Sequence, residues 1–349
     1  MSDTFEEASV LVVGGAGFVG SNLGRDLLSR GVDSLYIIDN FMSSEPSSLP
    51  DDDRVHFIYG SAADPRVLGN LPEHLDYVWH LACYHGNQSS IADPFADHDN
   101  NALPSLALFH HLSSYVELRK VVYAAAGCAV AEKTYGEAQA TSEDAPISLF
   151  HDSPYSISKL IGELFGNYFF GQSGLPFVRA RFQNVYGPRE ILGAGQWRRT
   201  PETVWRNVIP TFVWRALHDL PLRLDNGGMA SRDFIFVEDI VEGLEILALR
   251  GSPGEAYNLA SGTETEILTL AELILEITES DSELLVAPAR EWDRSGRRFG
   301  SVGKAKEQLG FTARTDLRDG LAATVDWMER NVVRIGACID RYASLADAT

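Results

Sequence analysis

Short apolar runs alternate with amphipathic stretches along the first half of the chain. Buried strands are predicted at six runs rich in β-branched and aromatic residues: 9–13, 35–38, 55–59, 77–81, 120–125 and 177–182. Between these runs, apolar residues recur at helical spacing over 18–29, 96–115 and 154–170. Alternating strands and helices predict a parallel sheet covered on both faces, as in a Rossmann-type doubly wound α/β fold.

The pattern changes after Gly187 and Pro188. Residues 189–206 carry Gly, Pro, Trp and Arg without periodicity, which indicates a long functional loop. Further helices are predicted at 208–217, 238–249, 268–279 and 317–331, and short strands at 234–237 and 257–260. We therefore expect two domains: a dinucleotide-binding domain over 1–187 that about 234–258 rejoins, and a smaller, mostly C-terminal α/β substrate lobe over 188–233 and 259–349.

The strongest local signal is a glycine-rich segment between the first strand and the first helix. Gly14 suits a tight turn, Gly17 lets the backbone approach a diphosphate, and Gly20 allows the helix to pack closely on the strand. The N-terminus of the helix adds N–H groups and the positive end of a dipole. Asp39 ends the second strand, where a carboxylate accepts hydrogen bonds from ribose hydroxyls and repels a 2′-phosphate. The predicted cofactor is therefore NAD rather than NADP.

A second signal is the Y-x-x-x-K pattern of Tyr155 and Lys159 in the predicted helix 154–170. Residues four apart share one face of a helix, and an ammonium beside a phenol lowers the phenol pKa. Such a tyrosine can take the proton from a sugar hydroxyl while hydride leaves the same carbon for a nicotinamide.

With these two signals in order, the sequence resembles the extended short-chain dehydrogenase/reductases of the nucleotide-sugar epimerase and dehydratase type. Further matching segments are 80–82, with the sequence His-Leu-Ala, and an asparagine at Asn101. The segments 181–188 and 232–239 are similar to the family patterns R-x-x-N-x-Y-G-P and R-D-F/Y-x-x-V-x-D. The late R-P-G-D pattern is kept in two of its four positions at 290–293.

The resemblance implies a role for each matching residue. It adds to the cofactor site Phe18, Val19, Asn40, Ser61, Leu81, Ala82 and Asn101, and it gives Lys159 the nicotinamide ribose. Asn184, Arg232 and Arg290 would hold the substrate's diphosphate, which suits fork-shaped guanidinium groups. Ser90, His85, Asn87 and Gln183 would lie near the sugar, where neutral two-sided groups suit hydroxyls.

The sequence departs from the family pattern after the fifth strand. The family places a serine or threonine there to help pull the proton from the sugar, whereas this chain has Ala126. Gly127 and Cys128 follow where dehydratases of the family often carry acidic residues. A thiol with a tuned pKa can act as a weak acid or base, so Cys128 is a candidate for compensation, with a plain packing role as the alternative.

Composition narrows the partners. The chain has 349 residues, with 49 acidic against 29 basic, and a net charge of −20 disfavours nucleic acid and anionic membrane. Three widely spaced cysteines suggest neither a disulfide framework nor a metal site. The acidic start of the chain is not typical of a signal peptide, and we expect a cytoplasmic protein. By analogy with the family, helices 96–115 and 154–170 would form a homodimer interface.

The sequence thus predicts an NAD-dependent sugar-nucleotide epimerase, with C4 as the favoured carbon and a UDP-sugar as the favoured substrate. In this mechanism Tyr155 takes the hydroxyl proton, and a transient 4-keto sugar rotates and is reduced on its other face. Two alternatives stay open. One is a dehydratase or decarboxylase that starts from the same oxidation, and the other is a non-catalytic dinucleotide-binding protein, which the alanine at Ala126 would suit.

Overall fold

The chain forms two compact units in the computed structural model, which describes residues 4–131, 134–194, 205, 207–291, 293 and 296–341. The first unit comprises Met1–Ala129, Ser153–Arg181 and Val241–Tyr257. The second comprises Val130–Asp152, Phe182–Ile240 and Asn258–Thr349.

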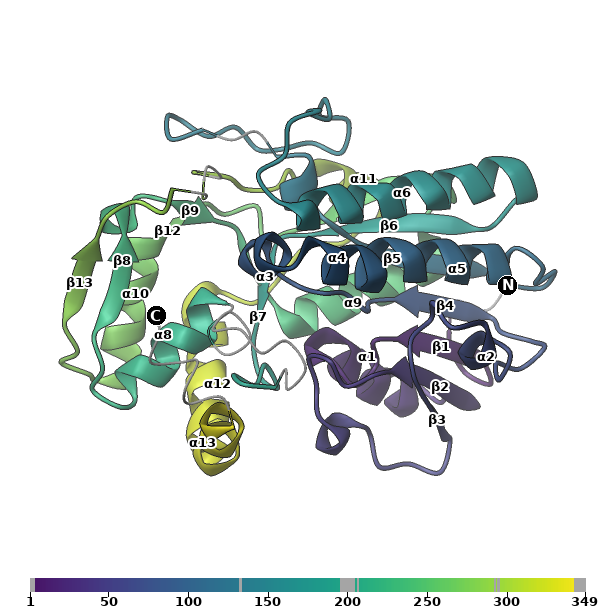
Figure 1. The fold of residues 1–349 in the computed structure, drawn as a ribbon, viewed down its shortest axis with the longest axis horizontal. Helices are drawn as coiled ribbons and strands as arrows, with labels where there is room; N and C mark the ends of the chain where they lie inside the picture. Colours follow the sequence, from purple (N-terminus) through teal and green to yellow (C-terminus); the bar gives the residue numbers. More distant parts are fainter. Residues whose placement is uncertain are drawn as a thin grey trace. The chain divides into compact units, whose positions relative to one another are not determined.

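A seven-stranded sheet forms the centre of the first unit, with the strand order β11-β6-β5-β4-β1-β2-β3 (Figure 1). Its strands are β1 (Ser9–Val13), β2 (Ser34–Asp39), β3 (Val55–Tyr59), β4 (Tyr77–His80), β5 (Lys120–Ala126), β6 (Phe177–Phe182) and β11 (Ala256–Leu259). β1 pairs in parallel with both β2 and β4, so the strand order reverses at this point. In open α/β sheets, ligands bind beyond the carboxyl ends of the strands at such a switch point. The predicted doubly wound α/β fold is confirmed.

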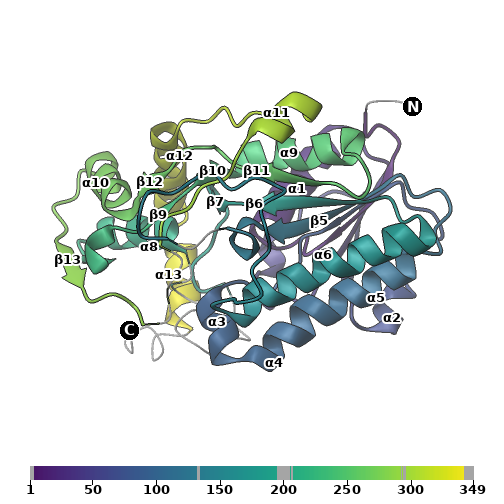
Figure 2. The ribbon, with the colours of Figure 1, turned by 90° about the horizontal axis from the view of Figure 1, so that it is seen from above.

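Helices cover both faces of this sheet (Figures 1 and 2). Against one face lie α5 (Leu103–Leu112) and α6 (Pro154–Ser173), whose Phe109 and Phe169 join a buried cluster with Val121 and Phe177. Against the other face lie α1 (Phe18–Ser29) and α9 (Val237–Arg250), and the Trp79 indole N–H donates to the Leu244 carbonyl over 3.2 Å. Each fully buried Leu or Phe side chain stabilises this core by about 1.5–3 kcal/mol.

The single helix predicted over 96–115 is wrong in detail. The structure has α4 (Pro94–Asp97), a π-helical segment (His98–Ala102) and then α5. Pro104 explains the break, because proline has no N–H to donate and its ring clashes with the carbonyl four residues earlier. The π-helical turn widens the backbone there, and such turns are frequent at functional sites.

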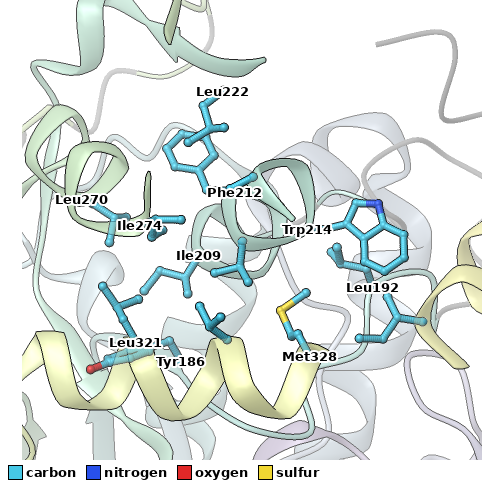
Figure 3. Close-up of a cluster of buried hydrophobic side chains, with 14 of the residues drawn as sticks. Tyr186, Leu192, Ile209, Phe212, Trp214, Leu222, Leu270, Ile274, Leu321 and Met328 are labelled. Atoms are coloured by element: carbon cyan, nitrogen blue, oxygen red, sulfur yellow. The ribbon is translucent and has the colours of Figure 1, made fainter. Parts of the chain in front are cut away.

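The second unit is built around its own hydrophobic cluster (Figure 3). Ile209 and Phe212 from α8 (Val208–Ala216) meet Leu270 and Ile274 from α10 (Ile267–Thr278), and Leu321 from α12 (Leu317–Arg330) closes the cluster. The three helices lie close to their predicted positions. α13 (Val332–Asp340) and α11 (Gly303–Leu309) were not predicted.

Three small sheets complete the second unit, and their pairing differs from expectation. β10 (Phe234–Phe236) pairs in parallel with β7 (Asn184–Tyr186) instead of joining the seven-stranded sheet. β9 (Ser231–Arg232) pairs with β12 (Thr265–Glu266), and β8 (Leu222–Asp225) pairs with β13 (Leu284–Ala287). The second unit already includes Val130–Asp152. After β6 it resumes at Phe182 rather than at 188, and the chain rejoins the first unit at Val241 rather than 234.

Two short helices remain in the first unit, α2 (Pro65–Leu68) and α3 (Asn87–Ala92).

Among the described helices, none combines the length and the apolarity that crossing a bilayer requires.

Candidate active site

The glycine-rich turn has the geometry that a dinucleotide site needs. Gly14 has φ +86°, and a Cβ there would lie 2.5 Å from the Ala82 backbone nitrogen. A Cβ on Gly20 would lie 2.2 Å from the Gly14 carbonyl oxygen, so only glycine lets α1 start this close to the turn. A Cβ on Gly17 would meet that same oxygen at 3.1 Å, and outside Gly17 and its two chain neighbours no second described atom lies within 4 Å of it. This free side of Gly17 leaves room for a diphosphate.

The start of α1 suits a bound phosphate as well. Gly17 is its N-cap, and among the described side chains none caps the helix. Phe18 and Val19 supply the first N–H groups of the helix, which are the groups that bind phosphates in such loops. The N–H groups of Leu81 and Ala82 both donate to the Val13 carbonyl over 2.8 Å, which fixes the end of β4 against the turn.

Asp39 holds the turn together in addition to its predicted role. Its Oδ2 accepts from the Ala16 N–H over 3.0 Å, while Oδ1 accepts from the Phe41 N–H over 2.8 Å and the Ser44 hydroxyl over 3.0 Å. Burial raises the Asp39 pKa, and these hydrogen bonds oppose the rise. A carboxylate offers about four lone-pair directions, so capacity for a ribose hydroxyl is left. These features fit the NAD that the sequence predicts.

The other two predicted ribose contacts lie in neighbouring turns. The Asn40 Oδ1 accepts from the Met42 N–H over 3.0 Å. The Ser61 hydroxyl, directly beyond β3 and Gly60, accepts from the Ala63 N–H over 3.2 Å. Asn40 follows β2 and Ser61 follows β3, so both residues lie at the carboxyl edge of the sheet. Their contact with a cofactor stays a prediction.

Tyr155 and Lys159 lie on successive turns at the start of α6. Ser153 caps this helix, because its Oγ accepts from the Ser156 N–H, and Pro154 occupies the first helical position. The Tyr155 ring meets the His85 ring edge to face, with centroids 5.6 Å apart. Lys159 is buried, and its Nζ lies 4.9 Å from the centroid of the Tyr123 ring.

Three of the predicted substrate residues lie in or beside α3, next to this helix. The Ser90 hydroxyl accepts from the Tyr155 N–H over 3.1 Å and donates to the Asn87 carbonyl over 2.8 Å. The Asn87 Oδ1 accepts from the Ser153 hydroxyl over 3.0 Å. Both residues therefore fix the N-terminus of α6, whereas His85 lies against the Tyr155 ring. Their contact with a sugar stays a prediction.

Ala126, which replaces the serine or threonine of the family, lies at the end of β5, as the sequence predicts. Ala126 is the last residue of β5, is buried, and leads into a short 3₁₀ turn (Gly127–Ala129). Its methyl group has no proton to exchange. The side chain of Cys128, the candidate for compensation, lies outside the described residues, as do 195–204 of the predicted functional loop.

Asn101 and a residue that the sequence analysis missed form a buried network beside the pair. The Asn101 Oδ1 accepts from the Tyr84 N–H over 2.7 Å, and its Nδ2 donates to Asp97 Oδ1 over 2.8 Å. Asp97 is a buried carboxylate. The signal that could have identified it is an aspartate four residues before Asn101, facing the same side of a predicted helix.

The second unit holds the remaining predicted substrate residues. Asn184 begins β7, and its N–H donates to the Asp233 carbonyl over 2.9 Å. The Gln183 side chain lies next to Gly300, where an added Cβ would meet its Nε2 at 3.0 Å. Asp233 is buried and accepts from Ser261, Gly262 and Gly300, so this carboxylate holds two loop segments in place, one at 261–262 and one at Gly300.

Both predicted diphosphate arginines already have acidic neighbours. The Arg232 guanidinium donates to the Ser231 and Gly296 carbonyls over 2.6 Å and lies 3.7 Å from an Asp293 carboxylate oxygen. The Arg290 Nε lies 2.5 Å from Asp225 Oδ2. These partners fix each guanidinium in the second unit, and diphosphate binding by the two arginines stays a prediction.

Comparisons with known proteins identify the family. The sequence model of the NAD dependent epimerase/dehydratase family matches residues 10–260. The crystal structure of the Bordetella bronchiseptica enzyme WbmF in complex with NAD+ and UDP has 48% sequence identity and a TM-score of 0.88, with 100% of each chain covered. The uncharacterized UDP-glucose epimerase YtcB of Bacillus subtilis is 30% identical over 339 residues, which is 91% of this chain and 97% of that protein.

A plant relative is longer. The trifunctional UDP-glucose 4,6-dehydratase, 3,5-epimerase and reductase RHM2 of Arabidopsis thaliana is 25% identical over 344 residues. This match covers 94% of the present chain, which spans about half (48%) of that relative's length.

The chain belongs to the NAD-dependent epimerase/dehydratase family. It is an NAD-dependent enzyme of the extended short-chain dehydrogenase/reductase type, as its sequence predicts.

Proposed function

We propose that this enzyme epimerises a UDP-sugar at C4. The observation that carries the proposal is the first turn of α6, where Tyr155 is fixed by Ser90 and Lys159 lies buried one turn later. WbmF, at 48% identity, was crystallised with NAD+ and UDP, which supports a uridine nucleotide as the substrate's carrier.

The chain's own residues act mainly on protons. NAD, when bound, supplies the two-electron oxidation of the sugar carbon and the reduction that reverses it. Tyr155 removes the C4 hydroxyl proton as general base and returns it after the 4-keto sugar has rotated. The Lys159 ammonium favours the phenolate form of Tyr155. Because Ala126 has no hydroxyl, Tyr155 performs this transfer without the usual neighbour.

Two further proposals concern the setting of the enzyme. We propose a homodimer through α5 and α6, which pack side by side and expose apolar side chains, among them Leu103, Leu164 and Tyr168. A Leu164→Arg variant is expected to sediment as a monomer, whereas a wild-type enzyme that is already monomeric contradicts the proposal. We also propose that the enzyme works in the cytoplasm, in carbohydrate biosynthesis, which suits the absence of a disulfide at Cys83.

The test is product analysis in deuterated water with UDP-, GDP-, dTDP- and CDP-sugars. A C4 epimerase gives a product of equal mass from a UDP-sugar, and NMR finds the inverted carbon at C4 without deuterium, because the carbon-bound hydrogen never reaches solvent. A product lighter by one water or by carbon dioxide identifies a dehydratase or decarboxylase. Deuterium at a carbon next to C4 contradicts simple C4 epimerisation.

A further inference from the structure

A buried carboxylate, that of Asp97, lies near the Tyr155–Lys159 pair and takes no direct part in the proton transfer by Tyr155. Asp97 ends α4 at the start of the π-helical segment, and its side chain is almost fully buried, at 2% exposure. Its Oδ1 accepts from the Asn101 Nδ2 over 2.8 Å. Burying an ionised carboxylate is costly unless an opposite charge and hydrogen bonds compensate it.

The compensating groups come from the π-helical segment and from α6. Asn101 Nδ2 also lies 3.2 Å from the Ser158 Oγ, and Ser158 hydrogen-bonds to the Tyr155 carbonyl over 3.1 Å. Ser158 immediately precedes Lys159 in the same helix. The Asp97 pKa lies above its usual value, because the effect of burial outweighs the hydrogen bonds from Ser158 and Asn101 and the nearby charge of Lys159, which lower the pKa.

We propose that Asp97 is a positioning residue for the catalytic pair: an ionised carboxylate that, held by Asn101 and Ser158, balances the buried Lys159 ammonium and so sets the proton affinity of Tyr155. The inference deepens the proposed function and rests on it for the role of Tyr155 as base. In this role the negative charge of Asp97 offsets the positive charge of Lys159 next to Tyr155.

Three other titratable groups among the described residues near the pair have different roles. Burial and the Lys159 charge lower the His80 pKa to about 3, so that imidazole is neutral. The Tyr123 phenol stays protonated, because burial raises its pKa. Glu163, farther along α6, is engaged by the Arg181 guanidinium through hydrogen bonds of 3.0 and 2.8 Å.

Two histidines lie near these groups, His98 next to Asp97 and His85 next to Tyr155. His98 follows Asp97 in the chain, is exposed, and lowers the Asp97 pKa. The His85 ring lies against Tyr155. A negative charge near Tyr155 disfavours the phenolate, so neutralising Asp97 is expected to lower the Tyr155 pKa.

The test uses an isosteric neutral variant, Asp97→Asn, with Asp99→Asn as matched control on the exposed side of the same segment. The readout is ¹³C NMR of the NAD-bound enzyme labelled at the tyrosine Cζ, with the Tyr155 signal assigned by its loss in Tyr155→Phe. We expect the Tyr155 titration to move to lower pH by about one unit in Asp97→Asn and not in Asp99→Asn. Identical midpoints in the wild type and Asp97→Asn overturn the proposal.

A second measurement covers the case in which Asp97→Asn does not fold. In the wild type, ¹³C NMR of labelled aspartate reports the Asp97 carboxyl directly: an ionised group at pH 7 supports the proposal, and a protonated group overturns it. Neither measurement needs turnover. If the Tyr155 titration moves as expected but no sugar nucleotide reacts, the positioning role stands and the proposed function fails.

Discussion

The Lys159 ammonium lies over the Tyr123 ring, with 4.9 Å between Nζ and the ring centroid, and the Tyr123 hydroxyl donates to the Lys159 carbonyl over 3.3 Å. One aromatic residue of β5 therefore supports the lysine of α6 through both its ring and its hydroxyl. A cation over an aromatic face is stabilised by about 2 kcal/mol when desolvated. This contact places the ammonium before any substrate binds.

The first prediction concerns the close packing of α6 against β5 at Gly162. A Cβ on Gly162 would lie 2.1 Å from the Tyr123 hydroxyl oxygen, so Gly162→Ala must displace the ring that supports Lys159. We expect Gly162→Ala to destabilise the protein by about 1–3 kcal/mol, as overpacking does, and to lower kcat. Urea unfolding and steady-state assays measure the two effects.

The matched control is Gly171→Ala on the same helix, where an added Cβ meets no described atom within 4 Å. Alanine favours the helix over glycine by about 0.5–1 kcal/mol, so this variant is expected to be slightly more stable. Equal losses in Gly162→Ala and Gly171→Ala would show that packing against Tyr123 is not the cause.

The second prediction concerns the cofactor turn. A Cβ on Gly20 would lie 2.2 Å from the Gly14 carbonyl oxygen, which cannot move without opening the turn. Gly20→Ala is expected to weaken NAD binding at least tenfold by calorimetry. In Gly24→Ala, on the same helix, the new Cβ meets a flexible Leu35 methyl at 3.3 Å, and affinity is expected to stay within about twofold. Tight NAD binding by Gly20→Ala would argue against this turn as the diphosphate site.

The third prediction is a pH dependence of stability between α1 and α9. Glu245 is buried, and its Oε2 lies 2.7 Å from an Arg30 guanidinium nitrogen. Burial and the neighbouring Asp26 raise the Glu245 pKa to about 9, against the effect of Arg30. Above pH 4.5 the unfolded chain loses this proton and the folded chain keeps it. The free energy of unfolding therefore falls as pH rises toward 9, by at most about 1.4 kcal/mol per pH unit.

Glu245→Gln removes the titrating group and keeps its shape. Urea unfolding between pH 6 and 9 is expected to give a flatter stability curve for this variant than for the wild type. The Asp26 pKa is lowered by hydrogen bonds to Glu245 and Arg30, so its contribution is lost only in acid, outside this window. Parallel curves for the two proteins would refute the assignment to Glu245.

The sequence predicts the first unit well for a physical reason. Buried parallel strands are continuous apolar runs, and both the glycine turn at Gly14 and the Ser153–Pro154 start of α6 carry strong local signals. The small sheets of the second unit carry none, because β9 and β12 have two residues each and their pairing depends on partners far along the chain. Their pairing, and the boundary between the two units at Phe182, follow from tertiary contacts.

The residues of the candidate site also fall into two groups, those found through sequence motifs and those whose roles depend on tertiary contacts. Tyr155 and Lys159 stand out in the sequence through their Y-x-x-x-K spacing together with the glycine-rich segment before it, and their catalytic role stays a prediction. For Asp97 the spacing before Asn101 gives a signal for the residue but not for its role, because that role depends on the π-helical turn and on contact with a helix that begins 57 residues later in the chain, at Pro154. The internal hydrogen bonds of Asp39 were missed for the same reason, since they are made by loop backbone.

The most direct test of the account is the activity of Tyr155→Phe on a UDP-sugar that the wild type epimerises. The variant keeps the ring against His85 and loses only the hydroxyl. We predict a loss of about 10²–10⁴-fold in the rate of C4 inversion, with NAD affinity unchanged. Wild-type rates in Tyr155→Phe would contradict the assignment of Tyr155 as the base.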